Sequence, residues 1–371
     1  MAGSELIGKE EKKEVMDILE TGVFMRYGFD EERKGIFKVR EFEKAFADYL
    51  GVGHTLGVTS GSAALKVALT ALDVGPGDEV IVPAFDFIAT YEVVLEVGAI
   101  PVMTDIDDSL NLDPDDIEAK ITASTKCVIP VHMCGAAARI DRIIEVAKKH
   151  NLLVLEDNAQ ACGGSYRGKK LGTLGDMGIL SFDYYKTMTT GEGGMVLTNS
   201  KALYDRSDWY HDHGHDHNPN VGRGDEGRSI LGFNFRMNEF QGAVGLAQLR
   251  KLFDPDGDTA TFLGFNLPDE KTTKRFQKLL ADRGVNTIYY RDNTWHYAPR
   301  WEHLIARATA NSTKFPFTNP MYKGKVEYRV EDIPHAEEIM SRTLFMIIPV
   351  KMSEETRAKN IDAIAEAGKT L

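Results

Sequence analysis

A regular alternation of short apolar runs with helical segments, over residues 55–155, most constrains how this chain can fold. The apolar runs predict strands at 55–58, 79–83, 100–104, 127–131 and 152–155. Helical segments lie between them, at 61–72, 87–97, 113–121 and 139–150. Strands that alternate with helices predict an α/β fold, in which helices cover both faces of a mostly parallel sheet. In such sheets, ligands bind beyond the carboxyl ends of the strands.

The pattern differs on either side of this alternation. Helices are predicted before it, at 1–22 and 38–50. From about residue 258 we expect strands at 261–267 and 285–290, helices at 271–283, 337–343 and 354–371, and an apolar run at 344–350. The change predicts two domains. Residues 1–250 would hold the N-terminal helices and a large ligand-binding domain, and residues 251–371 a smaller α+β domain.

Composition excludes several classes of function. The chain has 371 residues and a net charge of −12, without a basic run, so nucleic-acid binding is not expected. No signal peptide and no apolar window of membrane-spanning length are found, which predicts a cytoplasmic protein that is not held in a membrane. The three cysteines are widely spaced and indicate free thiols rather than disulfides or a zinc site.

One lysine stands between two predicted buried strands. Lys186 lies in SFDYYKTMTTGEGG (181–194), with apolar runs at 177–180 and 195–197. A lysine on a tight connection between buried strands is held by the scaffold, and lysine amines form Schiff bases with carbonyl compounds such as pyridoxal phosphate. A lone loop lysine is more often a solvated surface residue, so this interpretation needs further site residues.

Polar residues at other strand ends supply candidates. Gly61 and Ser62 begin a predicted helix, where backbone N–H groups bind phosphate. Asp157 follows a predicted buried strand and could keep a pyridine nitrogen protonated, which makes the ring an electron sink. The alternatives are a plain helix N-cap at 60–62 and an ordinary strand-end turn at Asp157.

Five motifs together resemble a known family. They are SGSAAL (60–65), GPGDEVIVPAFDFIAT (75–90), LEDNAQACGGSYRGKKLGTLGD (155–176), SFDYYKTMTTGEGGMVLT (181–198) and GFNFRMNEFQGAVGLAQL (232–249). In this order they resemble the DegT/DnrJ-type sugar aminotransferases, which are fold-type I (aspartate aminotransferase-like) enzymes. The resemblance implies a large domain that binds pyridoxal 5′-phosphate and a small C-terminal domain.

The resemblance also implies roles for single residues. Lys186 matches the lysine that forms the Schiff base and moves a proton between substrate and cofactor. Asp157 matches the partner of the pyridine nitrogen, and Gln160 the residue that contacts the 3′-oxygen. Phe87 matches the aromatic side chain that stacks on the ring.

Other matches concern the cofactor phosphate. Gly61, Ser62 and Ser181 match phosphate ligands. Asn234 matches an asparagine that, in this family, reaches the phosphate of the neighbouring subunit's cofactor. The resemblance therefore implies a homodimer with a shared active site.

The implied reaction moves an amino group from glutamate to a keto or aldehyde sugar. Some relatives carry histidine at the lysine position and act as dehydratases, so Lys186 favours transamination. The segments at 181–194, 211–219 and 232–241 resemble members of the family that aminate the C8-oxidised form of 3-deoxy-manno-octulosonate, a lipopolysaccharide sugar. The alternatives are a nucleotide-linked keto sugar as substrate, a sugar dehydratase, and a non-catalytic sugar-binding protein.

A histidine-rich segment, WYHDHGHDHNP (209–219), precedes the last motif. Its four histidines, His211, His213, His215 and His217, are predicted to recognise the substrate. A polar surface loop is the alternative; a metal site is not predicted, because alternating histidines on a loop have no obvious closure around an ion. A substrate carboxylate needs cationic partners, for which the candidates are Arg228, Arg236 and His296. Structural ion pairs are the alternative for the two arginines.

One segment departs from the family pattern. The resemblance implies a longer helix and connection after Leu249 than residues 251–258 provide. The segment is either short by nature or shortened in this chain. A native short connection would alter the hinge between the domains and the geometry of the dimer.

Overall fold

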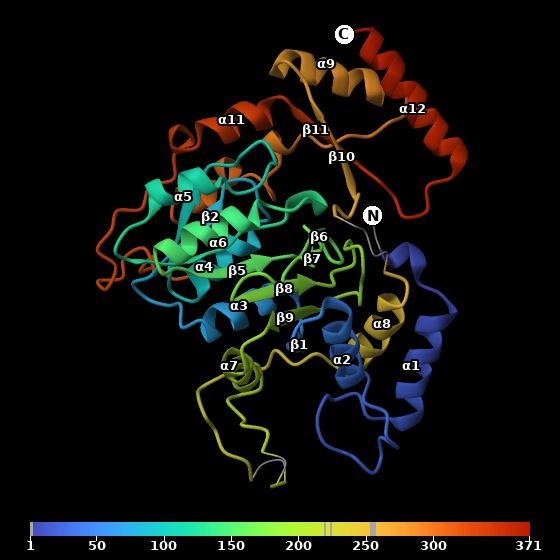
Figure 1. The fold of residues 1–371 in the computed structure, drawn as a ribbon, viewed down its shortest axis with the longest axis vertical. Coiled ribbons are helices and arrows are strands. Elements are labelled where there is room, and N and C mark those ends of the chain that lie inside the picture. Colours follow the sequence, from blue (N-terminus) through green and yellow to red (C-terminus); the bar gives the residue numbers. More distant parts are fainter. Residues whose placement is uncertain (1–2, 219, 223–224, 253–256) are drawn as a thin grey trace.

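The computed structural model describes residues 3–218, 220–222, 225–252 and 257–371. A seven-stranded sheet with the order β1-β9-β8-β5-β4-β2-β3 forms its centre (Figure 1). Its strands are β1 (His54–Val58), β2 (Glu79–Pro83), β3 (Ile100–Thr104), β4 (Thr125–Val128), β5 (Leu153–Asp157), β8 (Met177–Ser181) and β9 (Gly194–Thr198). Only β9 runs against its neighbours, β1 and β8, while the other pairings are parallel. The predicted α/β fold with a mostly parallel sheet is therefore confirmed.

Helices cover both faces of this sheet. Successive residues of a strand point to opposite sides, and here the residues on both sides are apolar and need to be buried. On one face, Val82 and Ile179 pack in the same core as α3 (Gly61–Ala71) and α4 (Ala89–Glu96). On the other face, Ile81 packs with α5 (Pro114–Lys120) and α6 (Ile140–Lys149). Both faces bury apolar side chains, which explains why the strands are continuously apolar in sequence. The small hairpin of β6 (Ser165–Tyr166) and β7 (Lys169–Lys170) lies between β5 and β8 in the chain.

The N-terminal helices pack against a helix from late in the large domain. Helices α1 (Lys9–Thr21) and α2 (Lys38–Leu50) contact α8 (Glu239–Leu249). Glu239 joins them: its carboxylate lies 2.9 Å from Nη1 of the buried Arg33 and accepts the backbone N–H of Val39 at 3.1 Å. Helix α7 (Lys201–His211) follows β9 and leads into the histidine-rich segment.

The C-terminal part has its own two-stranded sheet. Strands β10 (Phe262–Asn266) and β11 (Thr343–Ile347) pair antiparallel, with α9 (Glu270–Ala281) and α12 (Glu354–Lys369) at the end of the molecule farthest from α7 (Figure 1). Helices α10 (Glu302–Ile305) and α11 (Pro334–Ser341) lie between α9 and β11 in the chain. The division into domains at residue 250 stays a prediction, and residues 253–256 of the short connection lie outside the described residues.

Two strand predictions need correction. The predicted strand at 285–290 is wrong: Ile288 forms only an isolated bridge with Phe345, and the chain then turns into a 3₁₀ segment, Tyr290–Asp292. The buried aromatic side chains of Tyr289 and Tyr290 explain the apolar pattern without a strand. Strand β4 ends at Val128 rather than 131, since Pro130 has no N–H for the ladder. None of the helices in the described ranges is long and apolar enough to cross a membrane.

Candidate active site

A cavity of about 620 Å³ lies at the carboxyl ends of β5 and β8, beside the start of α3. This volume is typical of a small-molecule site. The predicted site residues that line it are Gly61, Ser62, Phe87, Asp157, Gln160, Ser181, Lys186 and His296. The structure thus gathers side chains that are spread over more than 230 residues of sequence, while their individual roles stay predictions.

Lys186 lies on the connection between β8 and β9, as the flanking apolar runs predict. Its backbone is fixed on both sides: its N–H donates to the carbonyl of Asp183 at 3.0 Å, and its carbonyl accepts the N–H of Gly3 at 2.7 Å. Burial lowers the pKa of the Lys186 amine, although the charges of Asp157, Asp183 and Asp86 oppose this shift. A lower pKa increases the neutral fraction of the amine, which is the form that attacks a carbonyl group.

Asp157 ends β5, and its carboxyl group faces the cavity from within the protein. Oδ1 accepts the backbone N–H of Ala159 at 2.9 Å, and Oδ2 accepts the hydroxyl of Thr90 at 3.3 Å. Burial raises the pKa of Asp157, and these donors together with Lys186 counteract the rise. Within the described ranges no cationic side chain lies within ion-pair distance of this carboxylate. A cationic ligand group, such as a protonated ring nitrogen, would supply the missing partner.

Behind Asp157, a buried pair fixes the end of β5. His132 Nδ1 accepts the backbone N–H of Ala138 at 3.2 Å, so Nε2 carries the proton and donates to Glu156 at 3.1 Å. Glu156 also accepts the backbone N–H groups of Gly172, Leu174 and Gly175. The backbone N–H of His132 donates to the carbonyl of Asp157 at 3.0 Å, which links this network directly to the cavity.

The start of α3 offers hydrogen-bond donors of the kind that bind an anion. Ser60 caps the helix by accepting the N–H of Ala63 at 3.0 Å, and the first N–H groups of a helix have no carbonyl partner of their own. A Cβ atom on Gly61 would lie 2.7 Å from the Cβ of Ser181, and one on Gly194 would lie 2.2 Å from the carbonyl of Ser60. Only glycine allows these close approaches, so the N–H groups of residues 61 and 62 and the Ser181 hydroxyl stay together at one end of the cavity.

Gln160, Phe87 and His296 complete the predicted cavity residues. The side-chain carbonyl of Gln160 accepts the N–H of Cys134 at 3.0 Å, which leaves its amide N–H₂ to donate to a ligand oxygen. The rings of Phe87 and His296 lie 5.4 Å apart. Burial, followed by the charge of Lys186, lowers the pKa of His296 to about 4, so this side chain is neutral at physiological pH.

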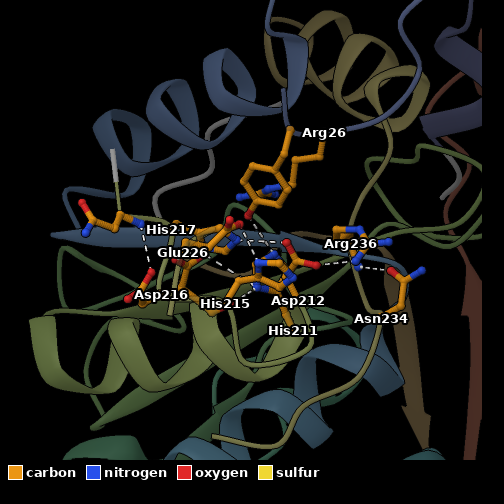
Figure 2. A network of polar contacts seen from close by, with 12 residues as sticks. Arg26, His211, Asp212, His215, Asp216, His217, Glu226, Asn234 and Arg236 are labelled. Carbon is orange, nitrogen blue, oxygen red and sulfur yellow. Dashed lines mark hydrogen bonds and ion pairs between the residues drawn. The ribbon is translucent and has the colours of Figure 1, made fainter. Parts of the chain in front are cut away.

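The histidine-rich segment lies outside this cavity and forms a polar network of its own (Figure 2). His217 is held between two carboxylates, with Nδ1 2.7 Å from Asp208 and Nε2 3.0 Å from Asp212. Both ring nitrogens must donate, so His217 is an imidazolium cation. Hydrogen bonds and charges of the two aspartates overcome the effect of burial and raise its pKa to about 9.

The other histidines have different partners. His211 donates from Nδ1 to the carbonyl of Asp208 and accepts the Tyr27 hydroxyl at Nε2, so it is neutral; burial lowers its pKa to about 3. His215 pairs with Glu226 at 2.6 Å, and His213 is exposed. The described residues contain no group of three or more His, Cys, Asp or Glu side chains placed to hold a metal ion.

Three further predicted residues lie along this network rather than in the cavity of the same chain. Arg236 forms an ion pair with Asp212, and its backbone N–H donates to the exposed Asn234 at 3.3 Å (Figure 2). Arg228 is exposed and donates to the backbone carbonyl of Glu226 at 3.0 Å. Their substrate or cofactor roles stay predictions.

The sequence analysis missed some cavity residues, among them Asp86, Thr90 and Trp295. Asp86 lies just beyond the carboxyl end of β2, so the strand-end signal that selected Asp157 could have found it. No local sequence pattern indicates Trp295. The backbone bridge between Phe85 and Tyr297, which are far apart in the chain, brings its segment to the cavity.

The fold and the cavity define an aminotransferase-like enzyme of fold-type I. An aminotransferase from Psychrobacter cryohalolentis is similar in structure, with a TM-score of 0.80, 27% identity and 98% coverage of each chain. The model of the DegT/DnrJ/EryC1/StrS aminotransferase family matches residues 5–257, and the chain belongs to this family. Membership confirms the predicted class of enzyme and indicates pyridoxal phosphate as its cofactor.

Two curated relatives show how far the similarity extends. GDP-perosamine synthase of Caulobacter vibrioides is 48% identical over 213 residues, which are 57% of this chain and 56% of the relative. The spore coat polysaccharide biosynthesis protein SpsC of Bacillus subtilis is 34% identical over 98% of this chain and 94% of its own length. The chain thus spans only about half of the first relative but nearly all of the second.

The residues present fit this cofactor. The start of α3 with Ser181 offers N–H and hydroxyl donors for a phosphate. Asp157 offers a ring nitrogen a carboxylate that has no ion-pair partner among the described residues. Gln160 has a free donor for a ring oxygen, and Lys186 lies in the same cavity. Each polar part of pyridoxal phosphate therefore has a complementary group.

Proposed function

We propose that this protein transfers an amino group from glutamate to the carbonyl carbon of a keto or aldehyde sugar. The observation that carries the proposal is the convergence of Lys186, Asp157 and the start of α3 in one cavity. When bound there, pyridoxal phosphate supplies an electron sink. Asp157 holds the ring nitrogen, the start of α3 holds the phosphate, and Lys186 takes and returns the proton at the substrate carbon.

The proposed cycle is tested by stoichiometry. Purified protein with pyridoxal phosphate and glutamate should release one 2-oxoglutarate for each sugar that gains an amino group. Lys186→Ala should abolish this turnover. Sugar consumed without release of 2-oxoglutarate would indicate the dehydratase instead, and neither product would indicate a non-catalytic sugar-binding protein.

A homodimer with shared sites is part of the proposal. Glutamate carries carboxylates, yet no arginine lines the cavity within the described ranges. The exposed Asn234 and Arg228, with Arg236 beside them, could supply the missing donors to the cavity of a second copy. Leu231 is 96% exposed and Phe233 58%, an exposure that supports burial of this segment by a partner.

Subunit mixing tests this arrangement. Lys186→Ala and Asn234→Ala dimers should each be inactive or weak, but mixed dimers should regain activity, because one of their two sites would carry both native residues. No recovery in mixed dimers of confirmed composition would place Asn234 and Lys186 in the same chain's site, against the proposal.

For the sugar, we propose the C8-oxidised form of 3-deoxy-manno-octulosonate, in the biosynthesis of lipopolysaccharide in the cytoplasm. The resemblance of the segment that contains His211–His217 supports this choice, and the three free, buried cysteines support a reducing compartment. Similarity to GDP-perosamine synthase favours a nucleotide-linked keto sugar as the second candidate. Comparison of kcat/KM for the two sugars, with glutamate as donor, decides between them.

A further inference from the structure

Asp86 places a second buried carboxyl group in the cavity, beside that of Asp157. Asp86 is 1% exposed and lies three residues beyond the end of β2. Oδ1 accepts the backbone N–H of Phe87 at 2.6 Å. Oδ2 is buried and has no hydrogen-bond partner anywhere in the described part of the chain. An unpaired buried oxygen that lines a ligand cavity indicates a contact that the ligand completes.

The backbone keeps this oxygen in place. The N–H of Asp86 donates to the carbonyl of His296 at 3.0 Å, and the N–H of Ile88 donates to that of Trp295 at 3.0 Å. The turn that carries Asp86 is thereby joined to the C-terminal half of the chain. Because the carboxyl group is fixed and buried, solvent outside the cavity cannot satisfy Oδ2.

The groups that face Asp86 determine where a proton resides. They are Asp157 from β5, Lys186 from the β8–β9 connection, and Tyr91 and Thr90 from α4. Burial, and then the negative charge of Asp157, raises the pKa of Asp86 well above its ordinary value. Asp157 accepts a hydrogen bond at each of its oxygens, from Ala159 and Thr90, whereas Asp86 accepts one at Oδ1 from Phe87 and has none at Oδ2. Asp157 is therefore the better stabilised anion of the two.

We propose that Asp86 is a further ligand-binding residue of this site: a neutral carboxylic acid that donates a hydrogen bond through Oδ2 to an acceptor oxygen of the bound molecule. The ionised Asp157 beside it binds a cation, so the two carboxyl groups have opposite tasks. The acceptor belongs either to the cofactor or to the sugar, and this inference rests on the proposed function for the identity of those ligands.

The protonation state is tested first, on the protein without cofactor. Infrared difference spectra at pH 7 between the wild type and Asp86→Asn should show a carboxylic acid C=O band that only the wild type has. Asp183→Asn is the matched control, because Asp183 lines the same cavity but is partly exposed and accepts the N–H of Tyr185. The band should persist in this control, and its absence from the wild type would overturn the proposal.

The donor role is tested with two variants of Asp86. Asp86→Asn keeps a hydrogen-bond donor without a charge, so it should bind the ligand that carries the acceptor oxygen within about twofold of the wild type. Asp86→Leu has no donor and should bind that ligand about three- to tenfold more weakly, as the loss of one net hydrogen bond implies. If cofactor-free Asp86→Leu has a larger Kd for pyridoxal phosphate than the wild type, the acceptor oxygen belongs to the cofactor. An unchanged Kd with a raised sugar KM would assign it to the sugar.

If both variants lose ligand affinity equally, the negative charge of Asp86 is what matters. If neither variant loses affinity, Asp86 makes no contact with the ligand. Each result overturns the proposal. Failure of the proposed function is distinguishable. In that case the wild type itself would not bind pyridoxal phosphate, while the infrared band of Asp86 would still be present.

Discussion

Protonated His217 should make the stability of the histidine-rich segment depend on pH. Its pKa is raised from 6.5 to about 9 in the folded protein by Asp208 and Asp212. The titratable groups around it are these two aspartates with Tyr27, His211 and His215. Because the folded pKa is the higher one, the stabilisation is complete below about pH 6.5 and is lost as the pH rises to about 9.

The size of the effect follows from this shift. A shift of this size corresponds to about 3 kcal/mol. His217 is partly exposed, and solvent screening reduces the expected contribution to about 1–2 kcal/mol. Hydrogen exchange of the backbone amides of His213 and Ser229, which donate to Phe233 and Gly214, reports local opening of the segment.

After correction for intrinsic exchange, the opening free energy should fall by about 1–2 kcal/mol between pH 6.5 and 9 in the wild type. In His217→Gln it should be lower at pH 6.5 and nearly constant with pH. His150→Gln is the matched control, since His150 pairs with Glu118 at 3.1 Å on the surface, and it should behave as the wild type does. Parallel pH profiles for the wild type and His217→Gln would refute the assignment of His217 as a cation held by Asp208 and Asp212.

Three further predictions concern the cavity and its support. Gly61→Ala should weaken binding of pyridoxal phosphate by about tenfold or more in a fluorescence titration, because the new Cβ would meet Ser181 at 2.7 Å and displace the start of α3; Gly368→Ala, with open space around it, should bind normally. Glu156→Gln should lower the free energy of unfolding, measured in urea, by about 3 kcal/mol, because four donors lose their anionic acceptor. Glu118→Gln on the surface is the control and should have little effect. An unchanged urea midpoint in Glu156→Gln would argue against this network. Lys186→Ala should still bind pyridoxal phosphate through the phosphate and ring contacts but should lose transamination, and retained turnover would exclude Lys186 as the proton carrier.

Local patterns in the sequence were sufficient for most of the large domain. Strands β2 and β3 have the predicted bounds, and Asp113 caps α5 ahead of Pro114. These elements combine a continuous apolar run or a strong cap with neighbours that bury them, so local and tertiary preferences agree. Prediction failed at 285–290, where aromatic side chains fill the core between the C-terminal segments without forming a ladder.

In the candidate site, too, local patterns identified some residues, and tertiary contacts determined the rest. Asp157 could be found because it ends a strand, Gly61 because it begins a helix, and Lys186 because it lies between two apolar runs; the family motifs then linked them. His217 could be noticed in sequence, but its charge depends on Asp208 of α7 and on Asp212, whose orientations only the fold determines. Trp295 entered the cavity through pairing of residues more than 200 positions apart, for which one sequence offers no signal.

The central claim is that Lys186 is the residue that holds pyridoxal phosphate. Borohydride reduction of the protein with its cofactor, followed by peptide mass mapping, tests this claim most directly. The account predicts a pyridoxyl group on the peptide that contains Lys186, and its loss when glutamate is added before reduction. A label on a different lysine, or no label in protein that binds the cofactor, would contradict the account.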